Sequence, residues 1–185
     1  MGLLQNIRWN LREKSMRHVI EKVTKLVYSE MFDLDKIVKS FPDSFKKKME
    51  VYVAIKYVSK NKFEFEECED DIIIRESKEL NKLNIGDATD DYYSILSKEH
   101  NENIFKLELE VSQLRAKEIL ILAESYFFTG KKLFEKNKYS YHGARYNLEN
   151  IQKGPLTFDQ HQKLKHLANE MDKVETKIQN HLSNK

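Results

Sequence analysis

Two histidines, His161 and His166, come nearest to a metal-ligand spacing in this sequence. A five-residue spacing places them about 140° apart on a helix, whereas a zinc-binding pair on one helix face is four residues apart. The five glycines never cluster, so the chain has neither a phosphate-binding loop nor a dinucleotide-binding turn. The single cysteine, Cys68, lies among acids that disfavour a reactive thiolate. The sequence therefore predicts no catalytic residue, no metal site and no cofactor.

Arg12 and His18 form an Arg-x5-His pattern within the first predicted helix. The pattern resembles the active-site motif of HEPN ribonucleases, small helical domains in which paired arginine and histidine act on RNA as dimers. The resemblance implies a helical ribonuclease in which His18 does general acid–base work. We hold this as the third functional hypothesis.

A cluster of basic and aromatic residues gives the second hypothesis, nucleic-acid binding. Cationic side chains can follow a phosphate backbone while tyrosine rings stack on bases. Alternatively, the tyrosines bury their rings in a helical hairpin and leave only their hydroxyl groups in water. The residues predicted to contact nucleic acid are Lys131, Lys132, Lys136, Lys138, Tyr139, Tyr141 and Arg145.

Charge is distributed in three blocks along the chain. Residues 1–62 have a net charge of +7, residues 63–124 of −10 and residues 125–185 of +5. Such asymmetry concerns partners more than fold, because summed charge attracts the opposite sign over a whole face. The basic ends can face the acidic middle, within the fold or across an oligomer, or they can meet an external polyanion. Ordinary solvated helix faces are the remaining interpretation.

Apolar residues at helical spacing predict a long helix at each end of the chain. Residues 1–31 carry one such stripe, beginning with Leu4, Ile7 and Leu11 beside several basic residues. Residues 156–182 carry a second stripe with coiled-coil spacing, and Thr157 can cap that helix. Packing within the chain's own core is the alternative to partner binding for both stripes. The basic N-terminal helix could also dock on a phosphate backbone or an anionic membrane surface. The residues predicted to bind a protein partner are Leu164, Leu167, Met171, Val174 and Ile178.

The segment after Pro42 can be interpreted in two ways. Pro42 ends a short helix over residues 34–39, and Asp43 or Ser44 can cap the next one. Residues 45–60 alternate as a strand does, yet the run is long for a strand, so we favour a buried helix. If it is a strand, it turns at Lys60 into a β-hairpin.

Two helices are expected in the middle of the chain. Residues 72–83 have helical spacing and stop at Gly86, a residue suited to a C-terminal cap, and Asp87 or Thr89 can start the next helix. Residues 101–136 are the longest helix candidate, with a short strand as the alternative over its alternating start.

The segment from residue 117 onward is expected to form a helical hairpin, residues 117–136 against residues 141–153. Part of it resembles a tetratricopeptide repeat, but no second copy follows at a 34-residue period, so a plain hairpin is favoured. The residues that carry this resemblance are Tyr126, Gly130, Ala144, Leu148 and Pro155.

These patterns predict a mainly α-helical protein, a bundle of about five to seven helices with room for a small β-hairpin or meander around residues 48–75. A single domain is expected over residues 1–185. No apolar run approaches the ~20 residues that cross a bilayer, and no targeting segment is recognised. With one cysteine, a reducing, cytoplasmic location is expected. We expect a non-enzymatic interaction or assembly subunit that binds another protein, or itself, through its terminal helices; the alternative is a nucleic-acid-binding accessory protein that uses the basic N- and C-terminal blocks.

Overall fold

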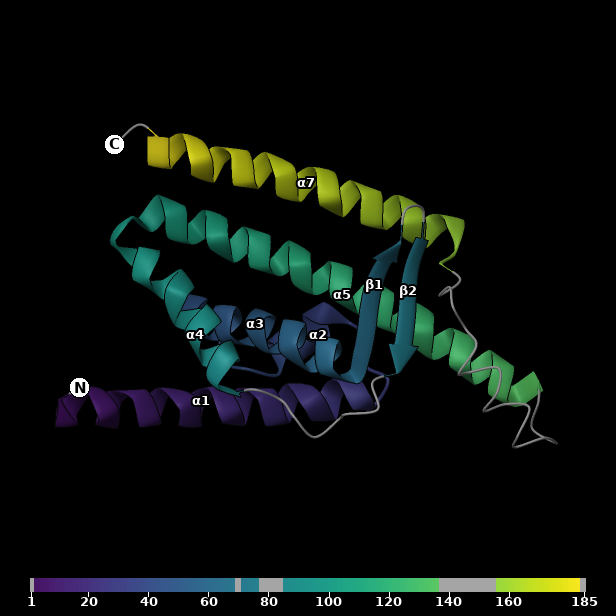
Figure 1. The fold of residues 1–185 in the computed structure, drawn as a ribbon, viewed down its shortest axis with the longest axis horizontal. Coiled ribbons are helices and arrows are strands. Elements are labelled where there is room, and N and C mark those ends of the chain that lie inside the picture. The colour runs from purple at the N-terminus through teal and green to yellow at the C-terminus, as the bar shows by residue number, and fades with distance from the viewer. Residues whose placement is uncertain (1, 69–70, 77–84, 137–155, 184–185) are drawn as a thin grey trace.

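The computed structural model describes residues 2–68, 71–76, 85–136 and 156–183 and shows a helical bundle with one small hairpin (Figure 1). The mainly α-helical prediction is confirmed. α5 and α7 run side by side along one edge of the molecule, α1 forms the opposite edge, and α3 lies between them. The elements are α1 (Leu3–Tyr28), α2 (Leu34–Lys39), α3 (Phe45–Lys62), β1 (Phe63–Cys68), β2 (Asp71–Glu76), α4 (Ile85–Leu96), the 3-10 turn η1 (Ser97–His100), α5 (Glu102–Lys136) and α7 (Phe158–Ser183).

α3 forms the centre of the main core, because it is apolar on nearly every side. Met49, Val51 and Ile55 are completely buried, and the helix packs between α1 and α5. A helix buried all round has no amphipathic period, which is why its sequence also alternates as a strand does. The predicted helix over residues 45–60 is confirmed. It starts where expected, since the Ser44 hydroxyl accepts a hydrogen bond from the Lys47 backbone N–H at 3.2 Å.

β1 and β2 form an antiparallel hairpin in which Phe65 pairs with Ile74. The hairpin crosses over α5, and its Phe63 and Ile74 are buried in a second core cluster with Leu122, Ala123 and Leu164. This small hairpin lies at the end of the region in which one was expected.

The predicted helix over residues 72–83 is wrong for its first five residues, which form β2. Three consecutive isoleucines favour a strand, and pairing with β1 buries the third of them, Ile74. Residues 77–84 lie outside the described part of the chain. Gly86 does not cap a preceding helix; it is the second residue of α4, whose first turn carries Asp87 next to the positive end of the helix dipole.

α1 packs on the core through its second half, where five residues are nearly completely buried. It ends with Glu30 in the left-handed conformation at φ 68°, and the Met31 N–H bonds to the Leu26 carbonyl at 3.2 Å. Asp33 then caps α2, as its carboxylate accepts hydrogen bonds from the backbone of Asp35 and Lys36, and the bond from Lys36 lowers the Asp33 pKa. The buried residues of α1 are Met16, Val19, Ile20, Val23 and Val27.

α7 begins where the sequence predicts. Thr157 accepts a hydrogen bond from the Gln160 backbone N–H at 3.2 Å, and the Gln160 side chain accepts one from the Thr157 backbone at 3.0 Å, a reciprocal capping box. α7 then packs along α5, and Arg115 on α5 lies 3.7 Å from Glu175 on α7. In the described part of the chain, no helix has the length and apolar character needed to cross a membrane.

Candidate protein-docking surface

The first three turns of α1 carry an exposed aliphatic stripe, which we call the N-terminal stripe: Leu4, Ile7 and Leu11. Their exposed fractions are 73%, 48% and 63%. Spacings of three and four residues put them on one helix face, roughly 150° around the axis from the face that carries Met16 and Val23. α1 forms the outer edge of the bundle (Figure 1), and the exposed fractions of these three side chains place them on its solvent side.

Trp9 and Arg12, on the opposite face, hold the start of α1 against α4. The Trp9 ring centroid lies 6.4 Å from that of Tyr93, and the Arg12 guanidinium carbon lies 3.9 Å from the Tyr93 ring centroid. Burial raises the pKa of Tyr93, and the nearby Arg12 opposes that shift. These contacts fix the rotation of the helix, so the N-terminal stripe faces solvent. The anchoring role of Trp9 was not predicted from the sequence. Its place on the helix face opposite Leu4, Ile7 and Leu11 is the signal that could have indicated it.

The exposed surface around the N-terminal stripe is basic. Arg8, Lys14 and Arg17 are exposed, and none of them makes an ion pair with any residue that the structure describes. The nearest acid in sequence, Glu13, accepts a hydrogen bond from the Trp9 indole at 3.2 Å. The first turn of α1 has no acidic residue, so the positive end of the helix dipole adds to the same potential.

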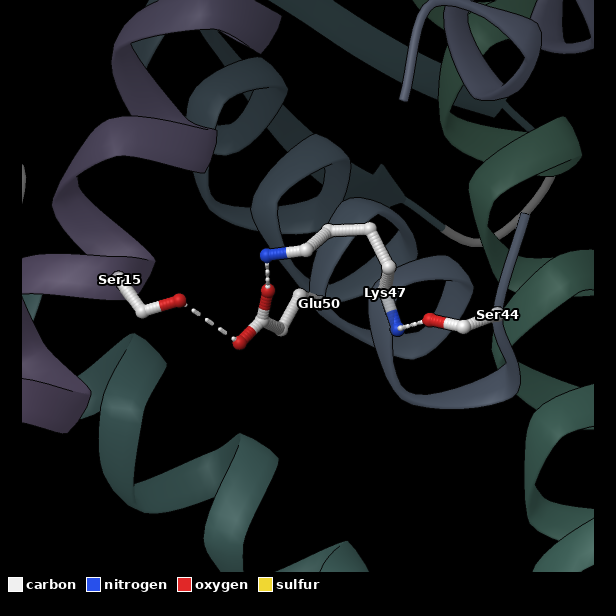
Figure 2. A network of polar contacts seen from close by, with 4 residues as sticks. All are labelled: Ser15, Ser44, Lys47 and Glu50. Carbon is white, nitrogen blue, oxygen red and sulfur yellow. Dashed lines mark hydrogen bonds and ion pairs between the residues drawn. The ribbon is translucent and has the colours of Figure 1, made fainter. Parts of the chain in front are cut away.

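A buried carboxylate, Glu50 on α3, ties this part of α1 to the core. Figure 2 shows the Ser15 hydroxyl donating to Glu50 at 3.1 Å, with the Lys47 ammonium group bonded to the other carboxylate oxygen. The Lys47 backbone also bonds to Ser44, so the network continues to the N-terminus of α3. Both Glu50 oxygens have partners, which is what a buried charge requires. The network therefore positions α1.

The five residues predicted to form a partner seam are buried inside the chain. Leu164, Leu167, Met171, Val174 and Ile178 are between 3% and 9% exposed, on the face of α7 that meets α5. This burial corresponds to the other interpretation of the sequence pattern, in which α7 packs within the chain's own core. Their role in binding a partner stays a prediction, and in this structure their side chains are covered by α5.

The predicted nucleic-acid cluster falls mostly outside the described residues. Lys131, Lys132 and Lys136 lie in the last turns of the α5 backbone. Lys138, Tyr139, Tyr141 and Arg145 lie outside the described part of the chain, as does the second helix of the predicted hairpin, residues 141–153. The nucleic-acid hypothesis therefore stays a prediction.

The remaining candidate residues are not brought together by the fold. Arg12 and His18 lie roughly 120° apart around α1, with Arg12 on Tyr93 and His18 exposed. His161 and His166 are both exposed on α7, and no group of three metal-ligating side chains occurs among the residues described. Neither pair forms a converging site within one described chain.

A cavity of about 240 Å³ lies between α7, α5 and the start of α2. Its floor is apolar, with Phe32, Leu120 and Leu167, and its volume is below the roughly 300–1,000 Å³ of most small-molecule sites. At its rim, Lys163 is already paired with Asp159 at 2.6 Å, and this carboxylate raises the pKa of Lys163. The cavity therefore reads as a packing gap between two helices.

Comparison with family models, curated protein sequences and solved structures finds no match for this chain. The geometry of α1 and its surroundings is therefore the basis for assigning a function.

Proposed function

We propose that this protein is a non-enzymatic interaction or assembly subunit that binds another protein through the N-terminal stripe of α1. One observation carries the proposal: three large aliphatic side chains are exposed in a row on a helix whose opposite face is anchored. Burying an exposed leucine or isoleucine side chain contributes about 1.5–3 kcal/mol, so Leu4, Ile7 and Leu11 offer substantial binding energy to a complementary surface.

The contacts on the opposite face of α1 support the same proposal. Trp9 and Arg12 pack on Tyr93 at the junction of α1 and α4. Their mutual contacts hold the helix before any partner arrives, which reduces the ordering cost of association. The residues predicted to bind a partner on the C-terminal helix are buried against α5, so the proposal does not use them as a docking surface.

Site-specific photo-crosslinking in the cells that make the protein tests this function. A crosslinking amino acid at Ile7 is expected to capture one dominant protein, whereas the same amino acid at Ala168, exposed on α7, is not. Adding Leu4→Ser and Leu11→Ser should abolish the Ile7 product while the circular dichroism spectrum stays unchanged. Equal products at both positions, or none at Ile7, would contradict the proposal.

A further inference from the structure

We infer that the partner segment is an amphipathic helix with acidic flanks, which pairs with the start of α1 as a short two-helix coiled coil. The inference rests on the proposed function and adds the chemistry of the partner. It is drawn from the register of the N-terminal stripe and from the charges on both of its sides.

The N-terminal stripe has the register of a coiled-coil seam. If Leu4 is an a position, Ile7 is d and Leu11 is the next a, which is the alternation of three and four residues that knobs-into-holes packing requires. Trp9 and Met16 then occupy f positions, directly opposite the seam. That is the face which α1 packs against α4 and the core, so seam and core face do not compete.

A lipid surface is the competing occupant of this face. The three aliphatic residues of the stripe span roughly 60° on a helical projection, and the sequence places Leu3 about 40° from Ile7, so the arc alone does not distinguish a helix from a lipid surface. Arg8 borders the stripe on one side and Lys14 on the other. The alternation of three and four residues, with charges immediately beside it, is the pattern of a helix pair, and binding to lipid vesicles tests the competing occupant.

The flanking residues determine the charge of the partner. In this register Arg8 is an e position and Arg17 a g position, and Lys14 occupies d at the end of the seam. All three cations are exposed and none has an ion-pair partner among the residues described. Glutamate or aspartate at the matching positions of a partner helix would satisfy them.

The same charges disfavour a second copy of α1 as the partner. A pair of identical helices would place four arginines around one seam, and the a, d, e and g positions from Leu4 to Arg17 contain no acid on either helix. Like charges at these positions select against self-pairing. Nucleic acid would use the cations but would leave the aliphatic seam in water.

Two synthetic helical peptides test the inference on the full-length protein. Both carry leucine and isoleucine at the seam positions; one has glutamate at e and g, and the other has lysine there. Fluorescence anisotropy should give roughly ten-fold tighter binding of the acidic peptide, because each arginine attracts glutamate and repels lysine. The double change Arg8→Glu with Arg17→Glu should reverse that preference. The matched change Lys165→Glu with Lys177→Glu on α7 should leave it unaltered.

Several results would overturn the inference. Equal affinities for both peptides would remove the acidic partner, as would stripe-dependent binding to vesicles of phosphatidylserine and phosphatidylcholine. A dimer in analytical ultracentrifugation that Ile7→Ser dissociates would replace the partner by a second copy. If neither peptide binds while the Ile7 crosslink in cells persists, the helix inference fails and the proposed function stands; if both are absent, both fail.

Discussion

Glu50 shows how a single buried charge can decide the position of a helix. Its carboxylate, 7% exposed, joins Ser15 of α1 to Lys47 of α3, and each oxygen has one of these partners. The network is internal to the fold, so its loss should affect stability before it affects any binding surface.

Replacing Glu50 with alanine is expected to lower the free energy of unfolding by about 1–3 kcal/mol, since Ser15 and Lys47 lose their shared acceptor. Urea denaturation measures this. Glu21→Ala, at an exposed position of α1, is the matched control and should stay within about 0.5 kcal/mol of the parent. If the two variants are equally stable, the network in Figure 2 does not hold α1 on the core.

The sequence predicts local contacts of single residues well and distant contacts poorly. Ser44 and Thr157 cap the helices that follow them, as expected, because a cap depends on residues two or three positions away. The anchoring of Trp9 on Tyr93 joins residues far apart in the chain, and no spacing rule contains that contact. The members of the N-terminal stripe could be found from sequence, but their exposure could not, since buried and exposed stripes have the same period.

At the scale of the elements, the terminal helices show the two outcomes of one sequence pattern. Both carry aliphatic residues at spacings of three and four. The aliphatic face of α7 is covered by α5, whereas the aliphatic face of the first three turns of α1 is exposed to solvent. The hairpin shows a second difficulty. Residues 72–83 as a run have helical spacing, whereas the three isoleucines at its start favour a strand, and pairing with β1 decides for the strand.

Met171, at the middle of the α7 seam and 3% exposed, tests whether α7 is an integral part of the bundle. Met171→Ala should destabilise the protein by about 2–5 kcal/mol, because it leaves a cavity between α5 and α7. Asn169→Ala, on the exposed side of the same helix, should change stability by no more than about 0.5 kcal/mol. A cost below about 1 kcal/mol for Met171→Ala would mean that the seam is loosely held and free to bind a partner.

Across the whole molecule, the three charge blocks meet partly within the fold. Lys56 from the basic first block pairs with Asp91 from the acidic middle at 2.9 Å. Internal pairing of this kind accounts for some of the asymmetry without any partner. Arg8, Lys14 and Arg17 around the N-terminal stripe have no ion-pair partner among the described residues, so internal pairing does not account for their charge.

The nucleic-acid hypothesis makes its own prediction for the whole charge distribution. If the basic C-terminal block follows a phosphate backbone, affinity for single-stranded RNA or DNA should fall steeply with salt, and Lys131→Ala with Arg145→Ala should reduce the slope of log K against log salt by about 1–2. Arg8→Glu with Arg17→Glu on α1 tests the basic N-terminal block in the same way, because a further fall in the slope would mean that those cations contact the nucleic acid too. Filter binding at several salt concentrations separates the outcomes. A slope near zero, or one indifferent to Lys131 and Arg145, would leave protein docking as the function that the basic surface serves.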